Sequence, residues 1–345
     1  MKINLFSPEN NQVVSLIPKR QTELMAALPD HEGEILETLD WANPKTLNNG
    51  DNTLPRHILF TFGYEGSMEE VYGVDFYLSQ NADFEDADVY EIAPFQTFIS
   101  IPNLLRNKTY YWKMVAEGES EPVAESETYR FTTAADMPQW YYLEGSTNIR
   151  DIGGLIAEDG KEIKTGLLIR GAQTDRTLKI NHEARYFLRH QLKIKSVLDL
   201  RLETEEYPEG RLPYGEIPYH ISSLAYGEFF DESENETTKK IFTVLADKSN
   251  YPIYMHCHAG CDRTGTVAFL LEALLGCKAQ DIANDYELSS LSIFGTRSRY
   301  SPDFIAMLGA LGKFGPTPAD AAKNYLLSCG ITEEQIASLK DIFLG

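Results

Sequence analysis

The chain has 345 residues, of which 43% are hydrophobic, and it carries a formal net charge of -21 at pH 7; this length and apolar content are sufficient for two domain cores. The acidic excess is largest in residues 1–137, which hold 9 Lys and Arg against 23 Asp and Glu. Such a surface disfavours nucleic acid and anionic lipid as partners, and no apolar run reaches the roughly 18 residues of a stable membrane insertion.

The cysteines lie in the second half of the chain: Cys257, Cys261, Cys277 and Cys329. They form no evenly spread framework, so we expect reduced thiols. The start of the sequence shows no signal peptide. We therefore expect a cytoplasmic protein, or an exported one if a signal had been trimmed.

The front half predicts an all-β domain over residues 1–135. Short segments rich in aromatic and β-branched residues are separated by turn residues, with no long helix between them. They fall at 57–64, 71–79, 97–101, 109–116 and 128–132. This spacing favours an antiparallel sandwich, to which Lys2–Ser7 would add a first strand, whereas residues 18–54 are interpreted as an irregular insertion or lead-in.

Parts of this half resemble a fibronectin type III module over residues 57–134. The resemblance is carried by the segments at 76–84, 101–105, 109–112 and 131–133. It implies a β-sandwich whose binding partner the sequence leaves unknown.

From residue 138 the pattern changes to alternating strands and helices. Buried strands are expected at 166–170, 194–200, 217–221 and 251–255, and helices at 181–191, 236–248, 263–275 and 279–288. Two later helices have clear starts, with Pro318 after Thr317 and a capping box from Thr332 to Gln335. The alternation predicts an α/β domain over residues 138–345 with a central, mostly parallel sheet flanked by helices. Ligand sites in such domains lie where strands end and helices begin.

One such junction reads Met-His-Cys-His-Ala-Gly-Cys-Asp-Arg-Thr-Gly-Thr-Val at 255–267. Gly260 permits a tight turn. The free N–H groups and the dipole at a helix start bind anions, and such a site stabilises a thiolate, the nucleophilic form of cysteine, at Cys257. Arg263 adds a planar fork that matches two phosphate oxygens. A nucleophile and a phosphate clamp thus share one loop.

The Cys-x5-Arg-Thr pattern, with His256 before it and Gly265 after it, resembles the signature of cysteine-based protein tyrosine phosphatases. The resemblance implies that Cys257 attacks phosphorus and forms a phosphocysteine, which water hydrolyses. It also implies that Thr264 stabilises the leaving thiolate and that His256 orients the loop. The residues implied in phosphate binding are His258, Ala259, Gly260, Cys261, Asp262 and Arg263.

Three other segments resemble the bacterial branch of that family and extend the resemblance over residues 138–345. They are Asn-Ile-Arg-Asp-Ile-Gly-Gly at 148–154, Leu-Ile-Arg-Gly-Ala at 168–172 and Asp-Leu-Arg at 199–201. We interpret Asn148, Arg150 and Asp151 as a buried, salt-bridged turn that supports the site, in preference to direct substrate contact.

A phosphatase needs a general acid to protonate the leaving oxygen. The Trp-Pro-Asp tripeptide of larger tyrosine phosphatases does not occur in this sequence. In the bacterial branch the aspartate of the phosphate loop is thought to serve, so Asp262 is the first candidate, Asp199 the second and Asp231 the third. The alternative for Asp262 is a charge partner of the helix start without a catalytic role.

The same loop could be interpreted as a metal or redox site. Zinc sites usually pair two separated clusters, and no second cluster occurs; adjacent residues at a strand end also point to opposite sides. We therefore expect no metal and no other cofactor. A reversible Cys257–Cys261 disulfide that protects the thiolate is a further hypothesis.

The sequence constrains the substrate less. Phosphoinositide-cleaving relatives usually carry lysine in the loop where this chain has Cys261, although a protonated His258 would partly replace that charge. Aromatic residues available for a phosphotyrosine slot, or for the core, are Tyr226, Phe229, Phe230, Phe294 and Tyr300.

We expect a phosphatase for phosphotyrosine proteins or for small phosphomonoesters. One alternative is an inositol phosphate or phosphoinositide phosphatase of the same chemistry. The other is a non-catalytic adhesion or scaffold protein with a phosphate-binding loop.

Overall fold

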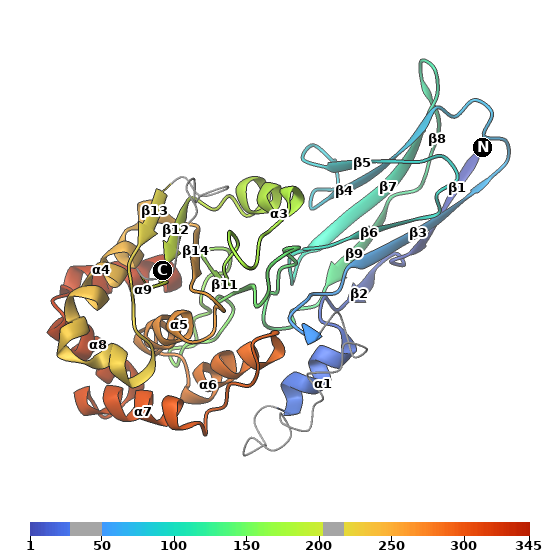
Figure 1. Cartoon of the computed structure of the whole chain (residues 1–345). Coiled ribbons are helices and arrows are strands. Elements are labelled where there is room, and N and C mark those ends of the chain that lie inside the picture. Colours follow the sequence, from blue (N-terminus) through green and yellow to red (C-terminus); the bar gives the residue numbers. More distant parts are fainter. Residues whose placement is uncertain (28–49, 203–216) are drawn as a thin grey trace. The chain divides into compact units, whose positions relative to one another are not determined.

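The computed structural model describes residues 1–27, 50–202 and 217–345, so the middle of the expected insertion, residues 28–49, lies outside the described residues. The chain divides into two compact units (Figure 1). The first contains Met1–Pro18 and Pro55–Met137, and the second contains Lys19–Leu54 and Pro138–Gly345. Within the described ranges, none of the helices combines the length and the apolar character that a membrane crossing demands.

The first unit consists of two β-sheets over one core. Its strands are β1 (Lys2–Ser7), β2 (Gln12–Val14), β3 (Ile58–Glu65), β4 (Gly73–Ser79), β5 (Asp88–Ile92), β6 (Phe98–Ile101), β7 (Thr109–Glu117), β8 (Pro122–Glu125) and β9 (Tyr129–Thr133). One sheet has the order β1–β3–β6, and the other has the order β2–β9–β7–β4–β5, with β8 paired to β7. The ring of Phe60 lies 4.8 Å from that of Phe76 and 5.2 Å from that of Trp112, which joins the two sheets through aromatic contacts.

The expected strands of this unit are present within two residues of their predicted bounds. The sandwich is not purely antiparallel as expected, because β2 pairs parallel with β9. The short strands β2, β5 and β8 were not predicted. β2 and β8 are too short to show alternation, and four of the five residues of β5 are exposed or only half-buried.

The second unit has a central sheet whose strands are β10 (Arg150–Asp151), β11 (Leu168–Gly171), β12 (Ser196–Asp199), β13 (Ile217–His220) and β14 (Ile253–His256). The order is β10–β11–β14–β12–β13; only β10 is antiparallel to its neighbour. Every residue of β11, β12 and β14 is buried, as expected for parallel strands covered on both faces. This confirms the predicted α/β domain with a mostly parallel sheet.

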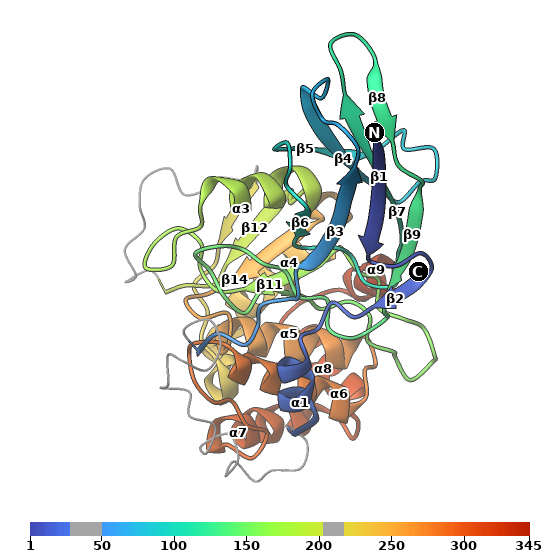
Figure 2. The same ribbon diagram turned by 90° about the vertical axis from the view of Figure 1, so that its right-hand side faces the viewer.

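Helices cover this sheet, α3 on one side and α5 to α8 on the other (Figure 2). The α-helices are α1 (Lys19–Ala27), α3 (His182–Tyr186), α4 (Asn235–Ala246), α5 (Arg263–Leu274), α6 (Ala279–Leu288), α7 (Pro302–Leu311), α8 (Pro318–Ser328) and α9 (Glu333–Leu344). The shorter helical turns of the described residues are η3 (Phe187–Gln191), η4 (Tyr226–Phe230), η5 (Glu232–Glu234), η6 (Lys248–Asn250), η7 (Ser289–Leu291) and η8 (Gly312–Phe314). The predicted caps of α8 and α9 are confirmed.

Two helices differ from expectation. The sequence of residues 263–275 predicts an amphipathic helix, but α5 is buried from Thr264 to Leu274, as expected for a helix in the centre of the unit. The helix α7 was not predicted, although Ser301 caps it and Pro302 occupies its first turn, which is a recognisable start signal.

The described ends of the segment interpreted as an insertion pack within the second unit. Leu24 of α1 joins a small apolar cluster with Trp140, Leu288 and Leu291, and both views place α1 beside α6. The N–H of Asn52 donates to the carbonyl of Leu291 at 2.7 Å. By its contacts, this part of the sequence therefore belongs to the α/β unit.

Candidate active site

The candidate nucleophile lies in the connection between β14 and α5, which we call the phosphate loop (residues 257–263). Gly260 has a φ of 68° in the left-handed region, and a Cβ there would lie 2.2 Å from the carbonyl oxygen of Gly171. Only glycine fits this turn without backbone movement. Cys257 itself is 2% exposed and is one of the buried residues of the main apolar cluster of the unit, so any substrate phosphate has to reach a deep thiol.

The carbonyl groups of the phosphate loop are held from outside. The carbonyl of His258 accepts from the N–H of Gln173 at 3.0 Å, that of Ala259 from Asn148 Nδ2 at 3.3 Å, and that of Gly260 from a guanidinium nitrogen of Arg170 at 2.9 Å. In a trans peptide the next N–H points opposite to the carbonyl.

The N–H groups of residues 259–261 therefore face away from these donors. None of the three makes a hydrogen bond to another part of the chain that the structure describes. Free N–H groups at the start of a helix can bind an anion, and phosphate binding by this loop stays a prediction.

Two side chains at the start of α5 complete this region. Arg263 is half-buried, and one of its terminal nitrogens lies 3.5 Å from the carbonyl of Leu200. The hydroxyl of Thr264 is buried and has no hydrogen-bond partner among the described residues. A buried hydroxyl without a hydrogen-bond partner lowers the stability of the fold. A bound anion or a thiolate would supply the partner that the Thr264 hydroxyl lacks.

A buried ion network of Asp285, Arg150 and Arg170 supports the phosphate loop. Asp285 of α6 accepts from Arg150 Nε at 2.8 Å and also pairs with Arg170; both arginines are fully buried. Burial alone would raise the pKa of Asp285, but the two arginines outweigh it and hold this pKa below its usual range. Arg150 donates to the side chain of Asn148, so the pairs connect to the loop through Asn148 as well as through Arg170.

The expected supporting turn has the anticipated buried position, with a different partner for each residue. Asn148 has a φ of 61°, and its N–H donates to Thr53 Oγ1 at 3.0 Å. Asp151 accepts from the N–H groups of Gly153 and Gly166, whereas Arg150 forms its ion pair with Asp285. Sequence reasoning missed Thr53 and Asp285, for which no motif existed.

Asp262, the first candidate for the general acid, is held by two neighbours. Arg297 forms a fork to its carboxylate, with Nε 2.6 Å from one oxygen and a terminal nitrogen 3.0 Å from the other. Tyr226 donates its hydroxyl to the same carboxylate. Burial raises the pKa of Asp262, but the hydrogen bonds and charge of Arg297 outweigh burial and hold this pKa below its usual range.

The other two acid candidates differ in their surroundings. Asp199 ends β12 and lies opposite His256 on β14, as expected, but its carboxylate is paired with Arg201 at 2.7 Å. Burial raises the pKa of Asp199, whereas His256 and Arg201 lower it, with a net downward shift. Asp231 is exposed and directly follows η4.

The five candidate aromatic residues separate into two groups. Phe229 and Phe230 are buried core residues that contact the ring of Tyr325. Tyr226 and Phe294 lie against the phosphate loop, and the ring of Phe294 is 5.5 Å from that of His258.

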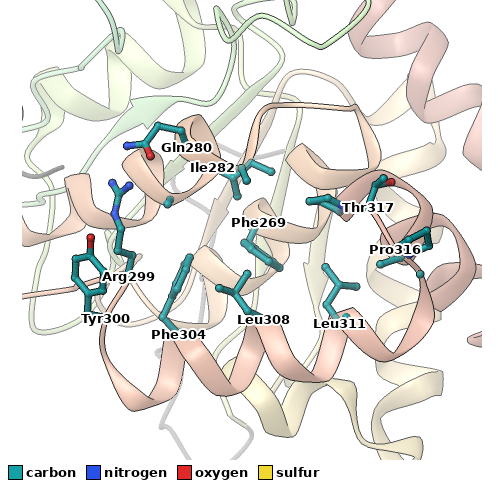
Figure 3. A pocket seen from close by; sticks show the side chains of 16 residues that line it. Phe269, Gln280, Ile282, Arg299, Tyr300, Phe304, Leu308, Leu311, Pro316 and Thr317 are labelled. Carbon is teal, nitrogen blue, oxygen red and sulfur yellow. The ribbon is translucent and has the colours of Figure 1, made fainter. Parts of the chain in front are cut away.

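Tyr300 instead borders a cavity of about 440 Å³ between α5, α6, α7 and α8. Figure 3 shows Gln280, Arg299 and Tyr300 at one end of it and apolar side chains such as Phe269 and Leu308 between the helices. No residue of the phosphate loop lines this cavity.

The two cysteines of the loop are free thiols. Cys261 is buried, and its sulfur lies 3.4 Å from Asn148 Nδ2 and 3.8 Å from Ser292 Oγ. Burial raises the pKa of the Cys261 thiol. The proposed disulfide to Cys257 stays a prediction. Over the described ranges, no group of three or more Asp, Glu, His or Cys side chains is placed to hold a metal ion.

Comparison with known proteins assigns the second unit to a family. The model of the tyrosine phosphatase family matches residues 141–345, which is more than half of the chain. No curated protein matches the sequence.

Among solved structures, the core catalytic domain of the PP-IP phosphatase SIW14 from S. cerevisiae is 19% identical, with a TM-score of 0.30, and the match covers 48% of this chain and 96% of that one. TpbA from P. aeruginosa, solved in complex with pTyr, is 16% identical, with a TM-score of 0.27 and coverage of 44% and 89%. On the family match, the chain belongs to the tyrosine phosphatase family and is a phosphoric monoester hydrolase of the protein-tyrosine-phosphatase type.

Proposed function

We propose that this phosphatase hydrolyses phosphotyrosine through a phosphocysteine on Cys257. The observation that carries the proposal is the set of N–H groups at residues 259–261, which point away from the donors that hold the loop carbonyls, lie between Cys257 and Arg263 in sequence and have no partner within the described chain. Phosphoryl transfer depends mainly on positioning and charge neutralisation. Main-chain dipoles and one guanidinium supply both here.

The reaction proceeds in two displacements. The thiolate of Cys257 attacks phosphorus, the bond from phosphorus to the phenolic oxygen breaks, and Asp262 gives a proton to that oxygen. Water then attacks the phosphocysteine, Asp262 takes a proton from the water, and the sulfur leaves as a thiolate that the Thr264 hydroxyl stabilises. Arg263 and the N–H groups hold the phosphoryl oxygens throughout.

The depth of Cys257 favours tyrosine over serine or threonine as the substrate residue. A phosphate on a tyrosine ring extends further from the peptide backbone than one on a short hydroxyl side chain, and the thiol is only 2% exposed. The ring of Phe294 beside His258 adds an aromatic surface at the loop. An inositol phosphate is the alternative substrate of the same chemistry, although the buried, uncharged Cys261 offers no counter-charge to further phosphates.

We also propose that the first unit is a fibronectin type III-like binding module. Its support is a sandwich with the orders β1–β3–β6 and β9–β7–β4–β5 over one aromatic core. Its partner would be identified by comparing the proteins that bind to full-length wild type with those that bind to full-length Cys257→Ser. A partner of the first unit should bind to both.

Turnover tests the proposal. Wild-type protein should hydrolyse p-nitrophenyl phosphate and phosphotyrosine peptides in the presence of a chelator, and Cys257→Ser should lose this activity while it still binds the peptides. A parallel assay with phosphoserine peptides and inositol phosphates ranks the substrates. Activity that survives in Cys257→Ser contradicts the mechanism. If the enzyme prefers inositol phosphates to phosphotyrosine peptides, the proposed substrate is wrong and inositol phosphates take its place.

A further inference from the structure

The segment Ser289–Arg297, which follows α6, contacts the phosphate loop along its length. Ser292 Oγ lies 3.8 Å from the sulfur of Cys261, and Phe294 packs against His258. At its end, Arg297 forms the fork to Asp262. The segment therefore reaches the loop from a different part of the chain and ends on its only carboxylate.

The guanidinium of Arg297 is fixed in place. Besides its fork to Asp262, its remaining terminal nitrogen donates to the carbonyls of Phe294, Gly295 and Thr296 at 3.2, 3.2 and 3.1 Å. The backbone of Arg297 is clamped by Ser290, whose Oγ accepts from its N–H at 2.7 Å and donates to its carbonyl at 2.8 Å. A cation held this rigidly also fixes the carboxylate that it pairs with.

Several ionisable groups face Asp262 from the surrounding elements. Tyr226 of η4 donates to it, and Tyr286 of α6 touches Tyr226 at 3.1 Å. Within the loop and the start of α5, Cys261 and Arg263 interact electrostatically with Asp262. Arg297 makes a cation–carboxylate contact of hydrogen-bond length to Asp262. Among the groups that lower the pKa of this carboxyl against the effect of burial, Arg297 has the largest influence.

We propose that Arg297 is a positioning residue for catalysis: its fork fixes the carboxylate of Asp262 within the phosphate loop and keeps it ionised until a phosphomonoester enters. The inference rests on the proposed function, in which Asp262 donates the proton. A phosphate bound at the N–H groups brings negative charge close to the carboxylate, and like charges at short range favour protonation of one of them. The carboxylate of Asp262 then takes up one proton from solvent, and substrate binding thus creates the proton donor that the free enzyme lacks.

The chain contains a matched control two residues away. Arg299 forms a similar pair with the buried Glu287, with Nε 2.9 Å from one carboxylate oxygen, and this pair does not touch the phosphate loop. Arg297→Gln and Arg299→Gln therefore both remove a partly buried cation that is paired with a carboxylate. Only the first changes the surroundings of Asp262.

The first readout is independent of turnover. In Cys257→Ser protein with 13C-labelled aspartate, the Asp262 carboxyl signal, assigned with Asp262→Asn, is titrated with and without inorganic phosphate. The midpoint should rise when phosphate is added, and it should rise by about one pH unit or more in Arg297→Gln without phosphate. Arg299→Gln should leave it in place.

The second readout is the pH profile of kcat/KM on a phosphotyrosine peptide. The alkaline limb should move to higher pH in Arg297→Gln, stay in place in Arg299→Gln and be absent in Asp262→Asn. Arg297→Lys, which keeps the charge but loses the fork, should show a smaller shift of the limb and a lower kcat. This conservative variant also covers the case in which Arg297→Gln does not fold.

An unchanged carboxyl titration in Arg297→Gln, or in Arg297→Lys if only that variant folds, overturns the inference, whatever happens to activity. The other outcome is that the Asp262 titration shifts in Arg297→Gln but the wild-type enzyme shows no turnover that depends on Cys257. It refutes the proposed function and leaves the pairing of Arg297 with Asp262 standing as a binding-site feature.

Discussion

Asp285→Asn should destabilise the second unit and inactivate it, because Asp285 is the shared partner of two fully buried arginines. Removal of one partner from a buried ion pair costs about 3–5 kcal/mol. For a unit of this size, a loss of that order lowers the melting temperature by about 6–20 °C. Activity should fall further than folding does, because Arg170 also holds the carbonyl of Gly260.

Glu287→Gln separates these two effects. Glu287 lies on the same helix, is equally buried and pairs with Arg299, yet it does not reach the phosphate loop. Both variants should lose stability in thermal and urea unfolding. The kcat per folded molecule, measured at about 20 °C below each variant's melting temperature, should fall by roughly 100-fold only in Asp285→Asn, as expected when a site is displaced by about 1 Å.

Glu272 gives a second check on the same network. Its carboxyl is fully buried without a hydrogen-bond partner in the described chain, and burial together with the charge of Asp285 raises its pKa well above the usual range. When Asp285 is neutralised, Glu272 can ionise and partly replace it. The double variant Asp285→Asn/Glu272→Gln should therefore lose more unfolding free energy than the sum of the losses in the two single variants.

Equal kcat in Asp285→Asn and Glu287→Gln would refute the role assigned to the network.

Three other predictions follow from the site. Asp262→Asn should reduce kcat more on phosphotyrosine than on p-nitrophenyl phosphate, because p-nitrophenolate needs less help from an acid in leaving; equal losses in steady-state assays would argue that Asp262 serves only as a charge partner. The pKa values of Asp199, Asp262 and Asp285 are lowered in the folded chain, so their contribution to stability is present above the unfolded value of about 3.9 and is lost as the pH falls through the folded values; urea unfolding between pH 7 and pH 3 should show this loss, and Asp262→Asn should reduce its size. Thr53→Val should lower kcat without an equal change in KM, because Thr53 holds the backbone of Asn148, which in turn holds Ala259; unchanged kinetics would show that the Thr53 contact is dispensable.

The extent to which the sequence predicts this protein differs between its parts. The strand–loop–helix around Cys257 could be predicted, because a buried apolar strand, a glycine and a helix start are adjacent in sequence and each has a local physical cause. The same is true of the caps at Thr317 and Thr332, since capping involves residues three positions apart.

Long-range partners could not be predicted in this way. Asp285 and Arg297 reach the phosphate loop only after α6 and the segment behind it have packed, and nothing in their local sequence marks them. Thr53 is a stronger case, because the β-sandwich strands β3 to β9 separate it in sequence from Asn148, and yet the two residues are hydrogen-bonded within the second unit. A single sequence shows periodicity and motifs, whereas such contacts depend on how the chain returns upon itself.

The central claim is that Cys257 carries the phosphoryl group during turnover. It is tested most directly by rapid acid quenching of the enzyme with a phosphotyrosine peptide, followed by mass spectrometry of the peptide that contains Cys257. The account predicts one phosphoryl group on Cys257, formed within the first turnover and absent from Cys257→Ser. Turnover with no phosphoryl group on Cys257, or with the group on His256 or His258, would contradict it.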